Sequence, residues 1–418
     1  MSSKYAKKTT LMILIDAFSK TYFSKKYTPF LYNLSRNGGL THIEPLFAFK
    51  GIETTIFTGV WPSVHNVWTE FCSVDNQIGS KKDELVRKII EAVDLLPNDE
   101  SKVKLRYAIE KYIFRKPHRP PSLIPAAAMA YFQPSQRREI TEPGAVGKIR
   151  TIFDVFRKKG VRFVFIEPWI WGDAGVFRNA KKLIKKEHKF NFWYLKFNNL
   201  DHLGHKIGPI PFAFKEQLLK IDRYVKEIVT LLQRKTPNLN VLVLADHGMS
   251  KVRKTENILE SLNHQKSEMY KDYVAFVDST VIRFWFFTKK AREEICEHMR
   301  QIKCGHILTD SEKKLLKIPL DIKYGETIFA VDEGYVLHPC FFHSKSLVKG
   351  MHGYAYPKTP EALPIMILNG EIAKNFQISK RVTYTDIAPV ILHSLLPDFS
   401  TSISARRGDT KFLHPAQG

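Results

Sequence analysis

Cysteine is scarce in this sequence, and no long hydrophobic run opens it. Only Cys72, Cys296, Cys304 and Cys340 occur in 418 residues, and no two of them have CxxC spacing. A disulfide framework is therefore not expected, and a reducing compartment fits this composition better. The first apolar run follows a polar start and is cut by Asp16, so neither a signal peptide nor a membrane span is expected there. These features predict a cytoplasmic protein.

Acidic residues are few compared with basic ones. The chain has 42 Asp and Glu against 65 Lys and Arg, a net charge of +23. Such a charge favours anionic partners, namely nucleic acid, an anionic bilayer surface or phosphorylated small molecules. Solubility or a heat-adapted surface is the simpler explanation, because the cations are spread through helical stretches such as 181–186. No nucleic-acid-binding motif is present, and peripheral contact with a membrane stays open.

Short apolar runs alternate with helical patterns along the chain. Residues 11–15, 161–166, 192–197 and 241–244 are typical of strands buried on both faces. Residues 214–232 carry apolar side chains near a period of 3.6, which predicts a helix. Strands that alternate with helices favour a three-layer αβα core around a mainly parallel sheet. Ligands of such sheets gather where loops leave the carboxyl ends of the strands.

Two stretches interrupt this alternation and are interpreted as inserted caps. Residues 70–145 are basic and helical, with one expected helix at 83–96 and a proline-rich passage at 115–125. Residues 271–349 begin with a strand at 281–287, followed by a helix at 291–302, and form a small α+β cap. Residues 1–69, 146–270 and 350–418 then make up the core. The caps are expected to set the choice of substrate.

Acidic and histidine residues follow several of the predicted strands. Asp16 and Asp246 each end an apolar run, His247 is adjacent to Asp246, and His352 precedes a glycine. Asp201 and His205 are separated by four residues, so both can face one ion from a single helical turn. Any one of these motifs is as consistent with a structural turn as with a ligand. Together, three carboxylates and three imidazoles suit two divalent ions, which about 4 Å apart clamp the oxygens of a phosphoryl group.

These motifs resemble the alkaline phosphatase superfamily, and its type I phosphodiesterases and nucleotide pyrophosphatases in particular. The resemblance rests on Asp16, on Thr58-Gly59 with Pro62 and His65, on 201–209, on 245–249, on 352–354 and on 385–389. It implies that one ion is held by Asp201, His205 and His352, and a second by Asp16, Asp246 and His247. Residues 200–209 also resemble the ethanolamine-phosphate transferases that build glycolipid anchors.

The sequence departs from this family at the nucleophile. The family places a Thr or Ser ten residues before the glycine of the Thr58-Gly59 turn, and here that position is Phe49, followed by Lys50. Three interpretations are open. Thr54 or Thr55 can serve as the nucleophile if the helix starts later than the pattern suggests. Lys50 can bind the phosphate at the N-terminus of that helix. Direct attack by metal-activated hydroxide is the third option.

The expected function is metal-dependent hydrolysis of a phosphate ester, preferably a phosphodiester or a nucleotide pyrophosphate bond. Zinc suits the ligands, with manganese as the alternative. A basic cap suits nucleotides, nucleotide sugars or phospholipid headgroups. The alternatives are a phosphotransferase that moves a headgroup phosphate to a sugar or lipid acceptor, and a non-catalytic relative that binds metal and phosphate.

Arg283, within an aromatic strand, is either a phosphate ligand or half of an ion pair. The sequence does not predict an oligomeric state.

Overall fold

A computed structural model describes residues 8–74, 88–89, 91–93, 95, 99–109, 123–125, 128, 131–168, 171–186, 189–342, 347–375 and 382–397. The expected helix at 83–96 and the proline-rich passage at 115–125 lie largely outside the described residues. Among the described residues, no helix combines the length and the apolar character needed to cross a bilayer.

The core is a six-stranded, mainly parallel sheet, as the strand and helix pattern predicts. Its strand order is β2-β16-β7-β1-β6-β5. The central strand β1 pairs in parallel with β6 and β7, and β5 extends this parallel part, whereas β16 runs antiparallel to both β7 and β2. The strands are β1 (Thr9–Ile15), β2 (Gly39–His42), β5 (Phe163–Ile166), β6 (Phe192–Phe197), β7 (Leu239–Leu244) and β16 (Ile365–Asn369).

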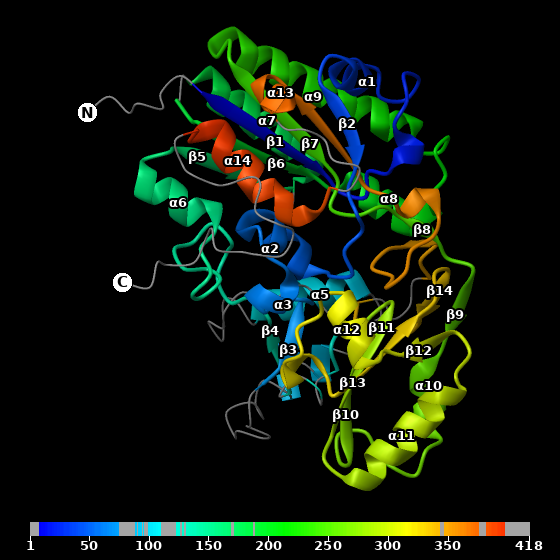
Figure 1. Cartoon of the computed structure of the whole chain (residues 1–418). Coiled ribbons are helices and arrows are strands. Elements are labelled where there is room, and N and C mark those ends of the chain that lie inside the picture. The colour runs from blue at the N-terminus through cyan, green and yellow to red at the C-terminus, as the bar shows by residue number, and fades with distance from the viewer. Residues whose placement is uncertain are drawn as a thin grey trace.

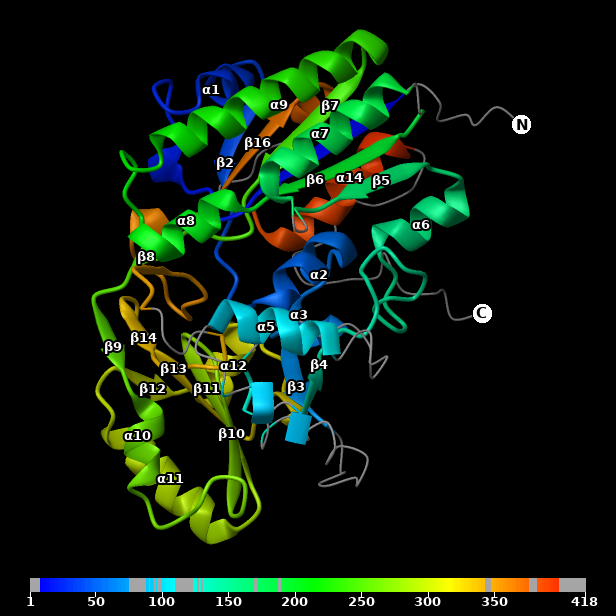
Figure 2. The same ribbon diagram turned by 180° about the vertical axis from the view of Figure 1, so that it is seen from behind.

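Helices cover both faces of this sheet, which makes the core three layers thick (Figures 1 and 2). Alternate residues of one strand enter different cores, because side chains of a strand point to opposite faces. Met12 and Leu14 join the cluster under α2 (Lys50–Thr58), α6 (Ile152–Lys159) and α14 (Ile387–Leu395). Leu11 and Ile13 join the cluster under α1 (Pro29–Arg36), α7 (Gly172–Lys185) and α9 (Lys215–Lys235). Burial on both faces explains why β1 is wholly apolar.

A second lobe lies below the core in Figure 1. It contains an antiparallel sheet in the order β10-β11-β13-β12 and a third apolar cluster. All four strands and the helix α11 fall within the predicted 271–349 insertion. The elements of this lobe are β10 (Tyr273–Val277), β11 (Val281–Phe286), α11 (Lys289–Gln301), β12 (Gly305–Ile307), α12 (Asp310–Leu315) and β13 (Thr327–Val331), with α10 (Ile258–Asn263) packed beside them.

Short strand pairs connect the two lobes next to the rim of the large sheet. The pair β8 (Ser250–Lys251) and β15 (Gly350–Met351) joins the segment after β7 to the segment that returns from the second lobe. The pair β9 (Lys254–Glu256) and β14 (Tyr335–Leu337) continues this connection. From the first insertion, β3 (Phe71–Ser73) pairs with β4 (Phe132–Pro134), and α5 (Asp99–Ala108) is also described. The remaining helices are α3 (Pro62–His65), α8 (Asn199–Ile207) and α13 (Glu371–Asn375).

Candidate metal centre

The six predicted ligands meet at the carboxyl-terminal rim of the large sheet. Asp16 follows β1, and Asp246 and His247 follow β7. Asp201 and His205 lie one turn apart on α8, which begins two residues after β6. Because β1, β6 and β7 are parallel neighbours, their carboxyl ends bring these loops together. His352 follows β15 and completes the group from the second lobe's return segment.

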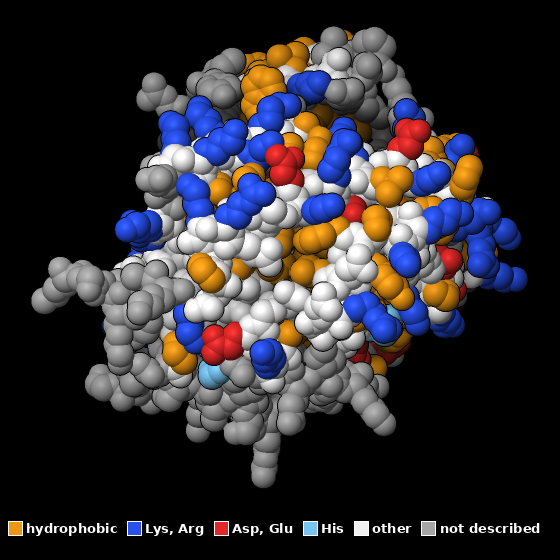
Figure 3. All heavy atoms as spheres, turned by 90° about the horizontal axis from the view of Figure 1, so that it is seen from above, with side chains coloured by type: hydrophobic (Ala, Val, Ile, Leu, Met, Phe, Trp, Pro, Cys, Tyr) orange, Lys and Arg blue, Asp and Glu red, His pale blue; other side chains and the backbone are white. Residues whose placement is uncertain are grey.

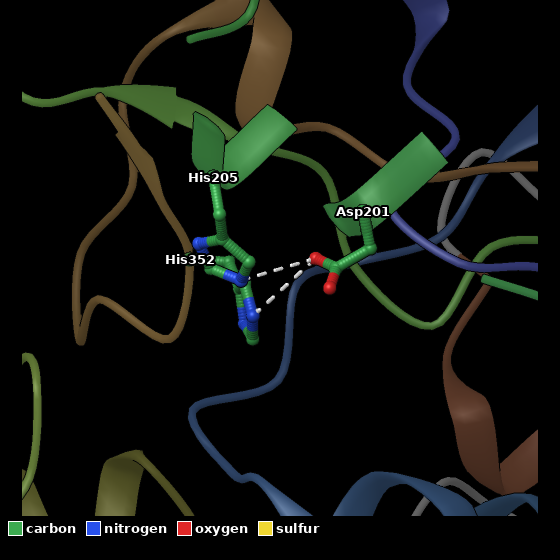
Figure 4. A group of neighbouring side chains, drawn as sticks. All are labelled: Asp201, His205 and His352. Atoms are coloured by element: carbon green, nitrogen blue, oxygen red, sulfur yellow. Dashed lines mark ion pairs between the residues drawn. The ribbon is translucent and has the colours of Figure 1, made fainter. Parts of the chain in front are cut away.

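The Asp201 triad consists of Asp201, His205 and His352, and its polar atoms point toward one another (Figure 4). Asp201 Oδ1 lies 3.4 Å from His205 Nε2 and 3.7 Å from His352 Nε2. The other ring nitrogen of His205, Nδ1, lies 2.9 Å from the carbonyl oxygen of Gly350. That hydrogen bond fixes the ring and leaves Nε2 facing the carboxylate, the arrangement expected of a metal-binding histidine.

The Asp16 triad consists of Asp16, Asp246 and His247, and it lies directly beside the first. His247 Nε2 is 3.1 Å from Asp16 Oδ1 and 3.8 Å from Asp246 Oδ1. His247 Nδ1 bonds the carbonyl oxygen of Gly248 at 2.8 Å, so its Nε2 also faces the carboxylates. The rings of His247 and His352 stack with centroids 3.5 Å apart, which places the two triads side by side.

The geometry and donor set of both triads fit divalent ions. In each triad, one potential ligand atom per residue lies within 4.8 Å of the others. Asp16 Oδ1 and Asp201 Oδ1 are buried, and their nearest polar partners among the described residues are imidazole nitrogens that do not meet hydrogen-bond geometry, which is costly for a carboxylate oxygen. A cation among the three ligands would satisfy these oxygens. The mixture of imidazole nitrogen and carboxylate oxygen suits zinc-like ions.

Burial and mutual proximity perturb the acidity of these groups. Burial and the neighbouring Asp16 carboxylate raise the pKa of Asp246 to about 6. Burial opposes a charge on His247, but Asp246 and Asp16 outweigh it and raise its pKa to about 10. Burial and the neighbouring His247 and His205 hold the pKa of His352 well below its usual value. An ion that enters the Asp16 triad must therefore displace a proton from His247.

Lys196 is a site residue that the sequence pattern did not identify. Its Nζ lies 3.1 Å from Asp16 Oδ2 and 3.5 Å from Asp246 Oδ2. The other oxygen of each carboxylate, Oδ1, faces His247. Although burial opposes its charge, Asp16 and Asp246 raise the pKa of Lys196 well above its usual value. The available signal was a lysine in the otherwise apolar strand 192–197, one residue before its end.

The start of α2 lies against the site and presents no hydroxyl group. Phe49 is the N-cap of α2, and a Cβ on Gly353, next to His352, would lie 2.6 Å from Cε1 of the Phe49 ring. Gly353 therefore allows this close approach, and its φ of +77° also favours glycine. The helix begins at Lys50 and ends at Thr58, and Gly59, with a φ of +73°, caps it. The later start required for a Thr54 nucleophile is therefore not observed.

Thr54 itself is fully buried, and its hydroxyl group is engaged elsewhere. It donates to the Lys50 carbonyl oxygen at 3.3 Å and to Gln136 Oε1 at 2.9 Å. Lys50 pairs with Glu53 one turn along the helix. Burial lowers the pKa of Lys50, but Glu53 and Glu70 outweigh that effect and raise it. Lys50 therefore keeps its positive charge at the N-terminus of α2, where it is paired with Glu53.

Arg283 belongs to the core of the second lobe. It is 0% exposed, and its Nη1 donates to the Phe71 carbonyl oxygen at 2.9 Å. Its guanidinium lies 4.6 Å from the Phe276 ring centroid, and burial lowers its pKa to about 10 against the attraction of Asp278. A buried arginine held in this way has no free path to a substrate. Its contacts among the described residues are a carbonyl oxygen and aromatic rings, and Asp278 acts on it through its charge without a direct ion pair.

The fold has close structural relatives of low sequence identity. The murine ectonucleotide pyrophosphatase/phosphodiesterase 5 is 16% identical, with a TM-score of 0.61 over 93% of this chain and 95% of that one. An inactive threonine-to-alanine variant of that protein in complex with AMP gives a TM-score of 0.64 at 16% identity, over 98% of this chain and all of that one. These matches confirm the αβα fold.

Two curated relatives match over shorter segments. The catalytic subunit of human GPI ethanolamine phosphate transferase 2 is 35% identical over 95 residues, 22% of this chain and 10% of that protein. GPI ethanolamine phosphate transferase 3 of Schizosaccharomyces pombe is 34% identical over 64 residues, 15% of this chain and 7% of that protein. The matched segments therefore span a tenth or less of either relative.

The sequence profile of the family described as type I phosphodiesterase/nucleotide pyrophosphatase matches residues 128–355. This range includes Asp201, His205, Asp246, His247 and His352, five of the six predicted ligands. Since the match covers more than half of the chain, the protein belongs to the type I phosphodiesterase/nucleotide pyrophosphatase family.

Proposed function

We propose that this chain is a metal-dependent hydrolase of phosphate esters that cleaves a phosphodiester or nucleotide pyrophosphate bond. The observation that carries this proposal is the meeting of the two triads, with His247 stacked on His352 between them. Two adjacent cation sites at the rim of a parallel sheet are what in-line phosphoryl chemistry requires. The AMP complex of the structural relative supports a nucleotide-like substrate. Nucleotide sugars and phospholipid headgroups remain within the proposed substrate class.

The triads would hold two divalent ions, one on Asp201, His205 and His352 and the other on Asp16, Asp246 and His247. Such ions polarise a phosphoryl oxygen and acidify water. We propose zinc, because three imidazoles accompany three carboxylates, with manganese as the alternative. The hydrogen bonds from His205 and His247 to backbone carbonyl oxygens keep their rings oriented toward the ions.

The residues around the triads support water, rather than a side chain, as the nucleophile. Phe49 occupies the N-cap of α2 beside the site, and the Thr54 hydroxyl is buried and bonded to Gln136. In this scheme the oxygen of water bonds to phosphorus and gives up a proton to solvent. The ester oxygen leaves with the bonding electrons and is protonated from solvent. Lys50, at the N-terminus of α2, would attract the substrate phosphate.

A phosphotransferase is the second candidate, because the segments shared with the two GPI ethanolamine phosphate transferases are 34–35% identical. A transferase would retain the phosphoryl group on a sugar or lipid acceptor. Product analysis separates the two candidates. A hydrolase incorporates one solvent oxygen into the product phosphate in ¹⁸O-labelled water, whereas transfer to an acceptor incorporates none.

The central test removes one ligand from each triad. His352→Ala and Asp246→Ala should each lower the content of tightly bound metal by about one ion per chain. Each should also reduce the hydrolysis of bis-(p-nitrophenyl) phosphate by at least about a hundredfold, since ligands matter at least as much as their supporting residues. His306→Ala is the control, because His306 is exposed and pairs with Glu312 away from the triads. Full activity and metal content in either triad variant, with a native circular dichroism spectrum, would remove the assignment.

We also propose a reducing, cytoplasmic environment for this chain. All four cysteines are buried and none is in a disulfide, which supports that proposal; they are Cys72, Cys296, Cys304 and Cys340. Fractionation of cells that express the native chain, followed by thiol labelling under denaturing conditions, tests it.

A further inference from the structure

Three helices share one outer side of the core. Figure 2 shows α7, α8 and α9 together on the side of the sheet that faces the viewer. The helices α7 and α9 run side by side along their length. Gln217 donates to Asp173 near their N-terminal ends, Phe177 stacks on Tyr224 at 4.1 Å, and Lys235 donates to the Ile184 carbonyl oxygen near their C-terminal ends. The outward residues of both helices therefore form one continuous surface.

This surface, the basic face, is strongly positive. The acidic residues of α7 and α9 do little to balance it, because Asp173 and Asp222 are buried and Glu227 pairs with Lys181, which leaves Glu216 exposed. Figure 3 looks onto the end of the molecule that carries α1 and α9 and shows Lys and Arg across it with few Asp or Glu between them. The exposed cations of the basic face include Arg178, Lys182, Lys185, Lys215, Arg223 and Lys226.

Large apolar side chains border the basic face at the end nearest the candidate metal centre. Trp171 is 66% exposed, Ile210 48% and Phe212 74%. These three residues, the apolar rim, flank both ends of α8. Trp171 adjoins Gly172, which approaches Asn199 at the start of α8, and Ile210 and Phe212 follow Gly208, which ends it. The outward residues of α8, His202 and Lys206, lie between them and are exposed.

We propose that the basic face and the apolar rim form a docking surface for an anionic lipid bilayer. Cations near an anionic leaflet lower the free energy of binding, and exposed aromatic side chains insert at the level of the headgroups. A nucleic acid would be attracted by the same charge. Bases that stack on aromatic side chains would need them among the cations, whereas Trp171 and Phe212 lie at the edge of the basic face. Charge complementarity and the apolar border together favour the bilayer.

Docking in this way would place the candidate metal centre close to the lipid headgroups. The helix α8 contributes Asp201 and His205 to the Asp201 triad, and the apolar rim lies at the two ends of that same helix. The proposal concerns binding alone and does not depend on turnover or on bound metal.

The test is co-sedimentation of the full chain with lipid vesicles in EDTA at 0.1 M salt. Phosphatidylcholine vesicles with 30% phosphatidylserine should bind the chain, and vesicles of pure phosphatidylcholine should not. Arg178→Glu/Lys182→Glu/Arg223→Glu should weaken binding by about tenfold or more, because each cation adds to the attraction. The matched control is Lys289→Glu/Lys290→Glu/Lys303→Glu, which makes the same change in net charge at exposed positions of the second lobe and should bind much more tightly than the basic-face variant. Trp171→Ser/Phe212→Ser should also weaken binding while leaving the net charge unchanged.

Several results would overturn the proposal. Equal losses in the two triple variants would attribute binding to net charge alone. The surface would be assigned to nucleic acid by two results together. The Trp171→Ser/Phe212→Ser variant would bind vesicles as well as the unsubstituted chain does. The unsubstituted chain would bind a 30-base-pair DNA duplex more tightly than vesicles, and the basic-face variant would lose that binding. Failure of the unsubstituted chain to bind anionic vesicles would end the proposal directly. None of these results affects the phosphoesterase proposal, which the triad variants test separately.

Discussion

Lys196 places a fixed positive charge beside one of the two candidate cation sites. Its ammonium group contacts the outer oxygens of Asp16 and Asp246, whose inner oxygens face His247. No lysine pairs with Asp201 in the part of the chain that the structure describes, where its charged partners are His205 and His352. Asp16 and Asp246 together with Lys196 therefore carry the same formal charge as Asp201 alone, when all imidazoles are neutral. The Asp16 triad should hold its ion less tightly than its two carboxylates alone would suggest.

Replacing Lys196 with methionine should therefore strengthen binding of the second ion. The change keeps the length of the side chain but removes a charge near the bound cation, and we expect an affinity about tenfold higher. Isothermal titration calorimetry with Zn²⁺ measures both sites. Lys196→Arg keeps the charge and should leave the two affinities nearly unchanged. Weaker binding of the second ion by Lys196→Met would instead mean that Lys196 holds the carboxylates in position.

Phe49 stands at the position where the family resemblance places the nucleophile. It occupies the N-cap of α2, where Ser or Thr would be expected both as a capping residue and, by family resemblance, as the nucleophile. Its ring lies against Gly353 beside the Asp201 triad. A hydroxyl at this one position would stand next to the candidate ions.

Phe49→Ser should therefore allow a covalent intermediate that the unsubstituted chain does not form. Acid quenching during turnover of a ³²P-labelled substrate should trap label on the variant but not on the unsubstituted chain. Phe49→Ala opens the same space without a hydroxyl and should remain unlabelled. Label on the unsubstituted chain would show that another side chain already acts as nucleophile, and absence of label on Phe49→Ser would place the helix N-terminus too far from the substrate.

Glu333 connects the short elements that position the histidines. It lies between β13 and β14, and its carboxylate accepts hydrogen bonds from Ser250 Oγ at 2.5 Å, Thr359 Oγ1 at 2.6 Å and the Lys358 N–H at 2.7 Å. Ser250 begins β8, which pairs with β15 immediately before His352. Burial raises the pKa of Glu333, but the hydrogen bonds from Ser250 and Thr359 outweigh it and lower the pKa below its usual value.

Glu333→Gln should lower the free energy of unfolding by about 1 kcal/mol at pH 7, because a charge-assisted acceptor is lost. A carboxyl group with a lowered folded-state pKa stabilises the fold above its unfolded-state pKa near 4.5 and loses that effect as the pH falls through its folded-state value. The difference between the two proteins should therefore shrink below pH 4.5. Urea unfolding at pH 7 and at several lower pH values measures it. A difference that stays constant with pH would contradict an ionised Glu333.

The whole molecule contributes to the candidate metal centre, because the triads draw on four separate segments. Asp16, Asp201 and Asp246 follow adjacent strands of the large sheet, whereas His352 lies on the segment that returns from the second lobe. Ions bound at this junction would hold the two lobes together in the native state. In the unfolded chain each triad is incomplete locally, because His352 lies 147 residues after His205 and Asp246 lies 230 residues after Asp16, so metal binds weakly.

Metal should consequently raise the melting temperature of the whole chain. A single ion at a hundred times its dissociation constant adds about 2.7 kcal/mol to the stability of the native state. Differential scanning calorimetry with excess Zn²⁺ and with EDTA should show an upward shift of a few degrees, which Asp246→Ala and His352→Ala each reduce. If both variants showed the same shift as the unsubstituted chain, the stabilising metal would have to bind outside the triads.

Strong local patterns in the sequence predicted much of the architecture. The runs at 11–15, 192–197 and 241–244 became β1, β6 and β7, because strands buried on both faces are continuously apolar. The long amphipathic pattern at 214–232 became α9. The antiparallel insertion of β16 between β2 and β7 was not predicted, since strand order depends on contacts between distant residues. The boundaries of the core and the caps stay predictions.

The sequence alone determined which six side chains to consider as metal ligands, because strand ends, glycine turns and helical spacing are local properties. The family resemblance already implied the members of the two triads. Only the tertiary structure decided that the triads are adjacent, that Lys196 bridges two carboxylates, and that Thr54 is buried with its hydroxyl occupied. It also decided that the cations of α7 and α9 lie on one surface beside the exposed Trp171 and Phe212. Distances between residues far apart in the chain are set by packing, which no local pattern records.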